Sequence, residues 1–340
     1  MTDDAPASLT LETIHGTITV TQPVIIELLQ HPVMTRLKEI DQHGPSTYFG
    51  NKPTFSRYDH SVGVFALLRL HDCPLVEQVA GLLHDASHTV FSHLADRLFK
   101  TGNQHAYQDK IHEWYLQRMG IDTILKRYGM SIEEILPDLP VFTALEQKLP
   151  RLCADRIDGV LREALSLEKI TLEQIKELHS ALHFENGHWY FDTPAAARLF
   201  ADCALYAQDM AVATIDNVVW EYWLCQALEQ AIALGILDSD TLHFGTDTVV
   251  LEILEAATDP HIQNMLARCK QPHTFYRAAR TKEQPHIHDM PKFRGVDPFI
   301  KLSDKRPLTK LTEHDAEYRG ILENARQRSN QGIRVCWITP

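Results

Sequence analysis

Residues 79–96 read VAGLLHDASHTVFSHLAD, and this stretch decides the fold because it joins an apolar helical run to a dense series of polar residues. His84 and Asp85 follow directly on the apolar residues, and His88 lies four positions after His84, which places both imidazoles on one helix face. A single buried histidine is usually a hydrogen-bonded core residue. Several histidines and aspartates in so short a segment are typical of metal binding or catalysis, because imidazole and carboxylate are common metal ligands.

Helical periodicity dominates the chain on both sides of this stretch. Residues 8–20 are an exception, since they alternate around His15-Gly16 as in a β-hairpin, and Asn186-Gly187 predicts a second hairpin. KFRGVDPFI (292–300), an amphipathic run at 313–328 and IRVCWI (333–338) predict strand, helix and strand. We therefore expect a predominantly α fold with an N-terminal β-hairpin and a small C-terminal α+β lobe. Apolar spacing predicts helices at 23–37, 56–72, 75–84, 91–99, 109–119, 152–165, 171–183, 195–234 and 247–257, with a loop at 44–53.

The formal net charge is −12, from 33 Lys and Arg against 45 Asp and Glu, which disfavours duplex nucleic acid and anionic membranes as partners. Residues 1–263 hold 18 basic and 37 acidic side chains, whereas residues 264–340 hold 15 and 8. The basic stretch from Arg268 to Arg294 is therefore a solvated face or a contact for phosphates or an acidic subunit. The six cysteines form no C-x-x-C pair, and no targeting or membrane segment is evident, so we expect buried thiols and a cytoplasmic protein.

Further ligands must come from elsewhere in the chain, because an adjacent His-Asp pair fills only part of a metal's coordination sphere. Upstream, SRYDHSVGVF offers His60 in a polar stripe. Downstream, LCADRIDGVLREA places Asp155, Arg162 and Glu163 on one helix face, opposite an apolar face. This charged stripe fits a pocket wall and a solvent-facing helix equally well.

The ordered set of these motifs resembles the HD-domain metal-dependent phosphohydrolases, whose signature is H…HD…D, and most closely their deoxynucleoside triphosphate triphosphohydrolase branch. FSRYDHSVGVF resembles the R-F-E-H-S-x-G-V of that branch, and LLHDASHTVFSHLAD resembles its H-D-x-x-H-x-x-F-S-H-x-x-D. CADRIDGVLREA resembles its D-R-x-D-Y-x-x-R-D, and GVDPFI its late V-D-P strand. IHGTITVTQPVIIELLQHPVMTRLKEIDQHG resembles its opening hairpin and helix. The resemblance covers residues 9–165 well and the remainder weakly.

Matched position by position, the resemblance implies that His60, His84, Asp85 and Asp155 bind one divalent metal ion. Such a mixed nitrogen and oxygen site suits Mn, Fe, Co, Ni, Zn or, less naturally, Mg. On this interpretation residues 1–50 form an N-terminal hairpin and helix, and 51–165 form the HD metal-binding core. Residues 166–285 form a helical extension and 286–340 a small α+β tail lobe.

The resemblance also implies catalytic and substrate-binding roles. His88 matches a position near the phosphate under attack. His112 matches a histidine that a carboxylate, here Asp96, holds as general acid for the leaving oxygen, with a raised pKa. The remaining matches are to phosphate contacts at Arg57, His93 and Arg156 and to sugar contacts at Gln42 and Glu163.

Two departures from the branch bear on the substrate. Gly159 stands where the branch has the tyrosine of D-R-x-D-Y, and residues 201–223 lack the arginine that the branch uses for the phosphate tail. The resemblance implies a nucleotide substrate, most specifically a deoxynucleoside triphosphate. A nucleotide phosphomonoesterase or phosphodiesterase on the same site, and a weakly active nucleotide-binding sensor or scaffold, are the alternatives. The resemblance implies a homo-oligomer, with which the opposed charges of the two chain portions are compatible.

Overall fold

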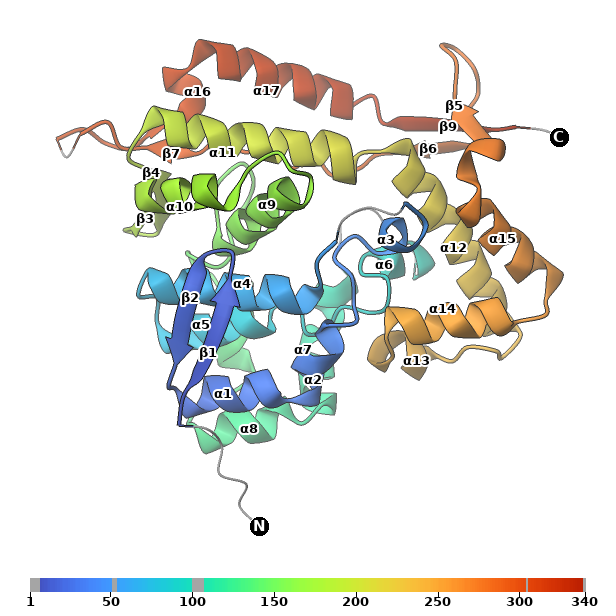
Figure 1. Ribbon diagram of the computed structural model, residues 1–340, viewed down its shortest axis with the longest axis horizontal. Coiled ribbons are helices and arrows are strands. Elements are labelled where there is room, and N and C mark those ends of the chain that lie inside the picture. The colour runs from blue at the N-terminus through green and yellow to red at the C-terminus, as the bar shows by residue number, and fades with distance from the viewer. Residues whose placement is uncertain (1–6, 51–53, 100–106, 304, 339–340) are drawn as a thin grey trace.

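The computed structural model describes residues 7–50, 54–99, 107–303 and 305–338, and helices dominate it, as the sequence predicts (Figure 1). The chain opens with the predicted antiparallel hairpin of β1 (Leu9–Thr13) and β2 (Gly16–Val20). Its register pairs Leu9 with Val20 and Thr13 with Gly16. Gly16 follows the turn with φ +116°, a conformation that side chains rarely adopt.

Prolines set two boundaries that the periodicity alone misses. The helix expected at 23–37 is two helices, α1 (Pro23–Gln30) and α2 (Pro32–Leu37). Pro32 lacks the N–H that a continuous helix needs but is well suited to a first helical position, and the His31 ring accepts a hydrogen bond from the Val33 N–H. The loop expected at 44–53 is likewise wrong in part, because the helix α3 (Pro45–Gly50) begins at a proline there.

Three packed helices form the centre of the first half, where α4 contacts both α5 and α9. A capping box starts α4, in which the Ser56 hydroxyl accepts from the Asp59 N–H and the Asp59 carboxylate accepts from the Ser56 N–H. The elements of this region are α4 (Arg57–Leu70), α5 (Leu75–Leu83), α6 (Leu94–Leu98), α7 (Tyr107–Arg118), α8 (Ile121–Arg127), a 3₁₀ turn (Glu133–Ile135) and α9 (Ala154–Ser166).

The helix expected at 195–234 is interrupted. It divides into α11 (Pro194–Ala207), a π-helical turn (Gln208–Val212) and α12 (Ile215–Ala233), because Thr214 caps a new helix by accepting from the Asn217 N–H. The second predicted hairpin is present, with Asn186 and Gly187 both at positive φ. The other elements here are α10 (Leu172–Ala181), β3 (Leu182–Glu185), β4 (His188–Phe191), α13 (Ser239–Phe244), α14 (Asp247–Ala256) and α15 (Pro260–Lys270).

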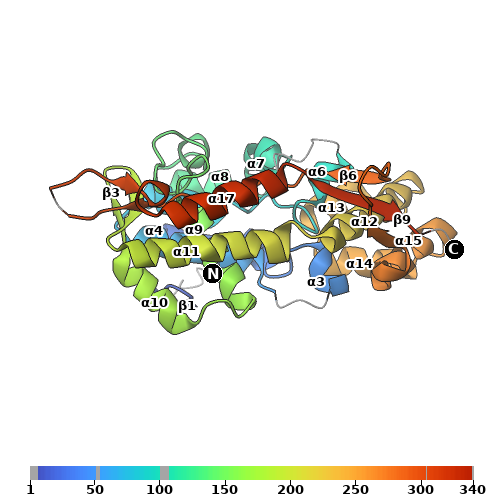
Figure 2. The same cartoon turned by 90° about the horizontal axis from the view of Figure 1, so that it is seen from above.

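The tail contains the predicted strand, helix and strand, but its strands pair with earlier segments. β7 (Phe299–Ile300) lies parallel to β4, and β9 (Ile333–Trp337) lies antiparallel to β5 (Tyr276–Ala278) and β6 (Ile287–Asp289). Seen from above, α17 (Ala316–Ser329) runs alongside α11 (Figure 2). The domain boundaries stay predictions. The remaining elements are a 3₁₀ turn (Pro272–Thr274), β8 (Thr309–Lys310) and α16 (Leu311–His314).

One buried apolar cluster extends from the hairpin to the last strand, including Val20, Phe65, Trp223 and Val335. The six cysteines are buried free thiols, as expected. Across the described ranges, none of the helices has the length and apolar character that a membrane crossing requires. This core packs the helices together, and their polar faces can therefore carry the residues of a functional site.

Candidate active site

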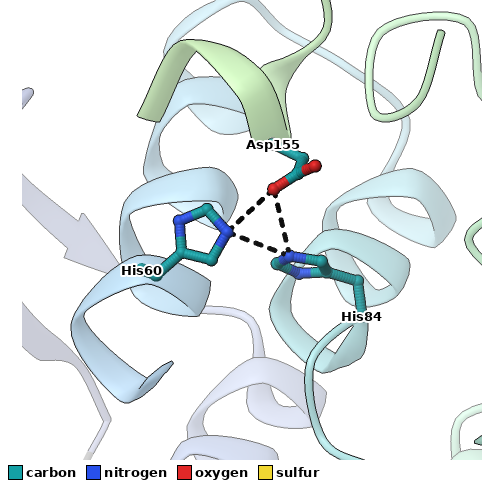
Figure 3. A group of neighbouring side chains, drawn as sticks. All are labelled: His60, His84 and Asp155. Atoms are coloured by element: carbon teal, nitrogen blue, oxygen red, sulfur yellow. Dashed lines mark hydrogen bonds and ion pairs between the residues drawn. The ribbon is translucent and has the colours of Figure 1, made fainter. Parts of the chain in front are cut away.

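Three helices bring the four predicted metal ligands together. His60 lies on α4, His84 and Asp85 directly follow the end of α5, and Asp155 lies in the first turn of α9. The His60 Nε2 atom is 2.8 Å from Asp155 Oδ1 and 3.3 Å from His84 Nε2, and all three side chains point to one centre (Figure 3). Asp85 adds Oδ1 at 3.5 Å from His84 Nε2 and Oδ2 at 3.9 Å from His60 Nε2.

This donor set fits a divalent metal ion. His60, His84 and Asp155 place ligand atoms within 4.8 Å of one another, Asp85 lies beside the two histidines, and a mixed nitrogen and oxygen set accepts several first-row metals. The side chains of His60, His84 and Asp85 are at most 6% exposed, whereas that of Asp155 is 34% exposed, so the centre is open to solvent on one side. Cys153 and Glu146 place ligand atoms within 4.8 Å of Asp155 and extend the cluster.

The charges at this centre favour a cation. Burial opposes a charge on His60, yet its hydrogen bonds to Asp155 and Asp158 raise its pKa to about 10. Burial likewise opposes ionisation of Asp85, but Arg57 and His84 hold the pKa of Asp85 well below its usual range. The site thus retains a proton where a metal ion would sit, and metal binding would displace it.

A buried carboxylate that the sequence analysis missed orients His60, one of the predicted ligands. Asp158 Oδ2 accepts a 2.7 Å hydrogen bond from His60 Nδ1, and Asp158 also accepts from Arg162 Nε at 2.8 Å. Metal-binding histidines usually donate their second ring N–H to such a carboxylate, which fixes the tautomer. The signal for it was available, because Asp158 lies three residues after Asp155 and therefore on the same helix face.

Arg57 and His88 lie beside the ligands. Arg57 Nη1 is 2.7 Å from Asp85 Oδ2, and Nε donates to Ser92 Oγ at 3.0 Å. Its Nη2 is buried and, among the described residues, has no hydrogen-bond partner. His88 Nε2 lies 3.3 Å from Asp85 Oδ1, while burial, reinforced by Arg57, lowers the pKa of His88 to about 4. The site therefore presents a spare guanidinium donor beside a neutral imidazole.

The other predicted phosphate contacts differ in their surroundings. His93 packs against His88, with ring centroids 5.0 Å apart. Arg156 donates to the carbonyls of Arg151 and Gln147 and so holds the loop that precedes α9.

Arg294, from the tail, also belongs to this neighbourhood, although the sequence analysis assigned it no role. Burial lowers the pKa of Arg294, Asp155 opposes that change, and Arg156 and Arg57 add to it. The sequence feature that could have identified Arg294 is the basic stretch from Arg268, which ends at this residue.

The predicted sugar contacts share one neighbourhood. Glu163 Oε2 is 3.1 Å from His43 Nε2, and His43 follows Gln42 in the chain. The Gln42 backbone N–H donates to the Phe55 carbonyl, close to the start of α4. Both residues therefore lie where α9 meets the segment that leads into α4.

The structure gives His112 and Asp96 partners other than each other, which corrects the predicted pairing. His112 Nδ1 is 2.9 Å from Ser87 Oγ, and its buried Nε2 has no hydrogen-bond partner among the described residues. Burial, followed by the charge of His84, lowers the pKa of His112 to about 4, so the expected rise is wrong. Asp96 instead accepts from the Tyr107 N–H at 3.0 Å and lies 3.6 Å from His93 Nδ1.

Comparison with known proteins identifies similar chains. No family model matches the sequence. The chain is 32% identical over 314 residues to the uncharacterised protein YdhJ of Bacillus subtilis, covering 92% of this chain and 94% of that one. It is 36% identical over 210 residues to the metal-dependent phosphohydrolase cns2 of Cordyceps militaris, covering 61% and 59% of the two chains.

Two more distant matches also have phosphohydrolase names. The deoxynucleoside triphosphate triphosphohydrolase SAMHD1 of Xenopus laevis is 28% identical over 145 residues, which cover 36% of this chain and 23% of that protein. A phosphohydrolase structure from Bacteroides thetaiotaomicron superposes with a TM-score of 0.73 at 14% identity, over 98% of this chain and 100% of the other. That likeness concerns the fold.

The helical fold, the converged histidine and aspartate donors and these relatives define a metal-dependent hydrolase that acts on phosphate esters or anhydrides. The chain belongs to the HD-domain metal-dependent phosphohydrolases, as the motifs predict. A divalent metal ion is the cofactor of this class.

Proposed function

We propose that this chain hydrolyses a phosphate bond of a nucleotide, most specifically of a deoxynucleoside triphosphate, at the centre built by His60, His84, Asp85 and Asp155. The observation that carries the proposal is the convergence of these four side chains beside the unpartnered Nη2 of Arg57. When bound, the metal ion supplies a Lewis acid that lowers the pKa of water and polarises the phosphate. Relatives with the name deoxynucleoside triphosphate triphosphohydrolase support the nucleotide class.

The residues around the ligands supply charge for a phosphorylated substrate. Arg57 directs its free donor to an anionic oxygen, and Arg294 adds a second guanidinium from the tail. Burial, followed by the charges of Arg294 and Arg156, lowers the pKa of Lys292. Neutral His88 serves as a hydrogen-bonding group near the reacting phosphate.

The sugar side of the substrate is proposed to meet Gln42 and Glu163. Gly159 leaves space beside this centre, since within 4 Å a Cβ there would meet, among the described residues, only His60 Cε1, at 3.8 Å. This open wall favours a second candidate, a nucleotide phosphomonoesterase or phosphodiesterase, in which a bulkier group occupies that space. Homo-oligomerisation and a cytoplasmic location stay predictions from the sequence.

The test is a product assay. The protein is incubated with Mn²⁺, Co²⁺ or Mg²⁺ and a panel of deoxynucleoside and nucleoside mono- and triphosphates. Release of inorganic triphosphate supports the proposal, and orthophosphate from monophosphates supports the second candidate. Intact nucleotides under every metal would leave only a binding or sensor role. His84→Ala should abolish turnover and metal binding, whereas His261→Ala, at an exposed position on α15, should change neither.

A further inference from the structure

A continuous chain of hydrogen bonds leads from the ligand His60 to the N-terminal hairpin. Asp158 joins them, because its Oδ2 accepts from His60 Nδ1 at 2.7 Å and its Oδ1 accepts from His15 Nε2 at 2.7 Å. The other ring nitrogen of His15 lies 2.7 Å from His179 Nε2, in the last turn of α10. The hairpin and three helices, α4, α9 and α10, therefore share one network.

The donor and acceptor roles in this network are constrained. The carboxylate of Asp158 can only accept, so both His60 and His15 must direct an N–H at it. This arrangement leaves His60 Nε2 facing the other metal ligands. Nδ1 of His15 then accepts from His179 when His15 is neutral, or donates to His179 when His15 is protonated. Either state satisfies every ring nitrogen that faces the network.

The hairpin turn directs the His15 side chain into the protein interior. Its side chain is completely buried, although hairpin turns usually expose polar residues to solvent. Thr13 holds the turn, since its hydroxyl accepts from the His15 N–H at 3.1 Å and donates to the Gly16 carbonyl at 2.9 Å. A residue that served only the turn would not need an imidazole directed at a buried carboxylate.

Little room remains around Asp158 for another arrangement. A Cβ at Gly63 on α4 would lie 1.9 Å from Asp158 Oδ1, and Arg162 occupies a further position on the carboxylate. The carboxylate is thus enclosed by a helix backbone, a guanidinium and two imidazoles. His15 is therefore one of the groups that fix the orientation of Asp158, which in turn contacts His60.

We propose that His15, with His179 behind it, is a positioning residue of the metal centre, which holds Asp158 so that His60 presents Nε2 to the metal. The inference rests on the proposed ligand set. Loss of the partners that orient a metal-binding histidine typically lowers metal affinity about 10- to 100-fold. A binding assay can detect a change of this size. The hairpin is therefore a functional part of the site as well as a part of the fold.

The experiment measures Mn²⁺ binding to metal-free protein by isothermal titration calorimetry, together with the Tm in chelator. His15→Phe keeps a ring but removes both hydrogen bonds, and should weaken Mn²⁺ binding about 10-fold or more. His15→Gln, whose amide can donate to Asp158, should recover part of the affinity. His188→Phe is the matched control, because His188 lies on β4 and its ring packs on Phe299. It should bind Mn²⁺ like the wild type.

A folded His15→Phe protein with wild-type Mn²⁺ affinity overturns the inference, even if its Tm falls. If His15→Phe does not fold, His179→Ala decides, since weaker Mn²⁺ binding supports the network and unchanged binding overturns it. Wild-type protein that binds Mn²⁺ but hydrolyses no nucleotide would refute the proposed function and leave this inference standing. Wild-type protein that binds no Mn²⁺ would overturn both.

Discussion

Gly63→Ala should destabilise the protein, although alanine is the better helix former. Gly63 lies inside α4, where alanine would ordinarily stabilise a helix by about 1 kcal/mol. Here the new Cβ would lie 1.9 Å from Asp158 Oδ1 and 2.5 Å from Arg162 Nη2. The carboxylate must therefore move by about 1.5 Å or more to reach ordinary van der Waals separation.

The cost follows from the contacts of Asp158. That movement stretches the 2.7 Å hydrogen bonds from His15 and His60, both buried. A hydrogen bond to a charged group contributes about 1.5–3 kcal/mol, so loss of the two costs about 3–6 kcal/mol. After the helix-propensity gain of about 1 kcal/mol, we expect the free energy of unfolding to fall by about 2–5 kcal/mol. Mn²⁺ affinity should fall about 10- to 100-fold, because His60 loses its orientation.

Urea denaturation followed by circular dichroism, in chelator, measures the stability, and calorimetry measures Mn²⁺ affinity. Gly320→Ala is the matched control, since Gly320 is exposed on α17 and a Cβ there meets no atom within 4 Å. This control should be more stable than the wild type by up to about 1 kcal/mol. The reasoning is refuted if Gly63→Ala is as stable as the control and binds Mn²⁺ like the wild type.

Three further predictions concern charge. Arg57→Lys should lower kcat/KM about 10- to 100-fold with little change in Mn²⁺ affinity, because it loses the spare guanidinium donor, and steady-state kinetics checks this. Since the pKa of His60 is raised to about 10, Mn²⁺ binding near neutral pH should release a proton, and identical calorimetric heats in buffers of different ionisation enthalpy would contradict this. Burial raises the pKa of Asp247 to about 6, so the unfolded state loses this proton first as the pH rises. Its contribution to the free energy of unfolding should therefore fall by up to about 3 kcal/mol from about pH 4 to 6, and Asp247→Asn should flatten that slope in urea denaturation.

Local patterns in the sequence predict much of the fold. Helical periodicity places α4, α5 and α9, since a buried helix face requires apolar residues every three or four positions. The motifs around His60, His84, Asp85 and Asp155 resemble those of the HD-domain phosphohydrolases, and this resemblance singles the four out as candidate ligands. Pro32 and Thr214 also indicate the two helix breaks locally. The prediction followed the continuous apolar periodicity and so missed both breaks.

Burial and long-range contact decided the rest. The pKa of His112 falls with burial among other imidazoles, which no spacing reveals, and its partner is Ser87. Arg294 reaches the metal centre only because the tail returns to the first half of the chain.

The sequence by itself indicated a mostly helical chain with clustered histidines and aspartates, and its motifs, which are local in the chain, resembled those of the metal-dependent phosphohydrolases and so implied the four donors. Only the tertiary structure joined His15 to Asp158, which are separated by 143 residues, because contacts across that distance depend on how whole helices pack.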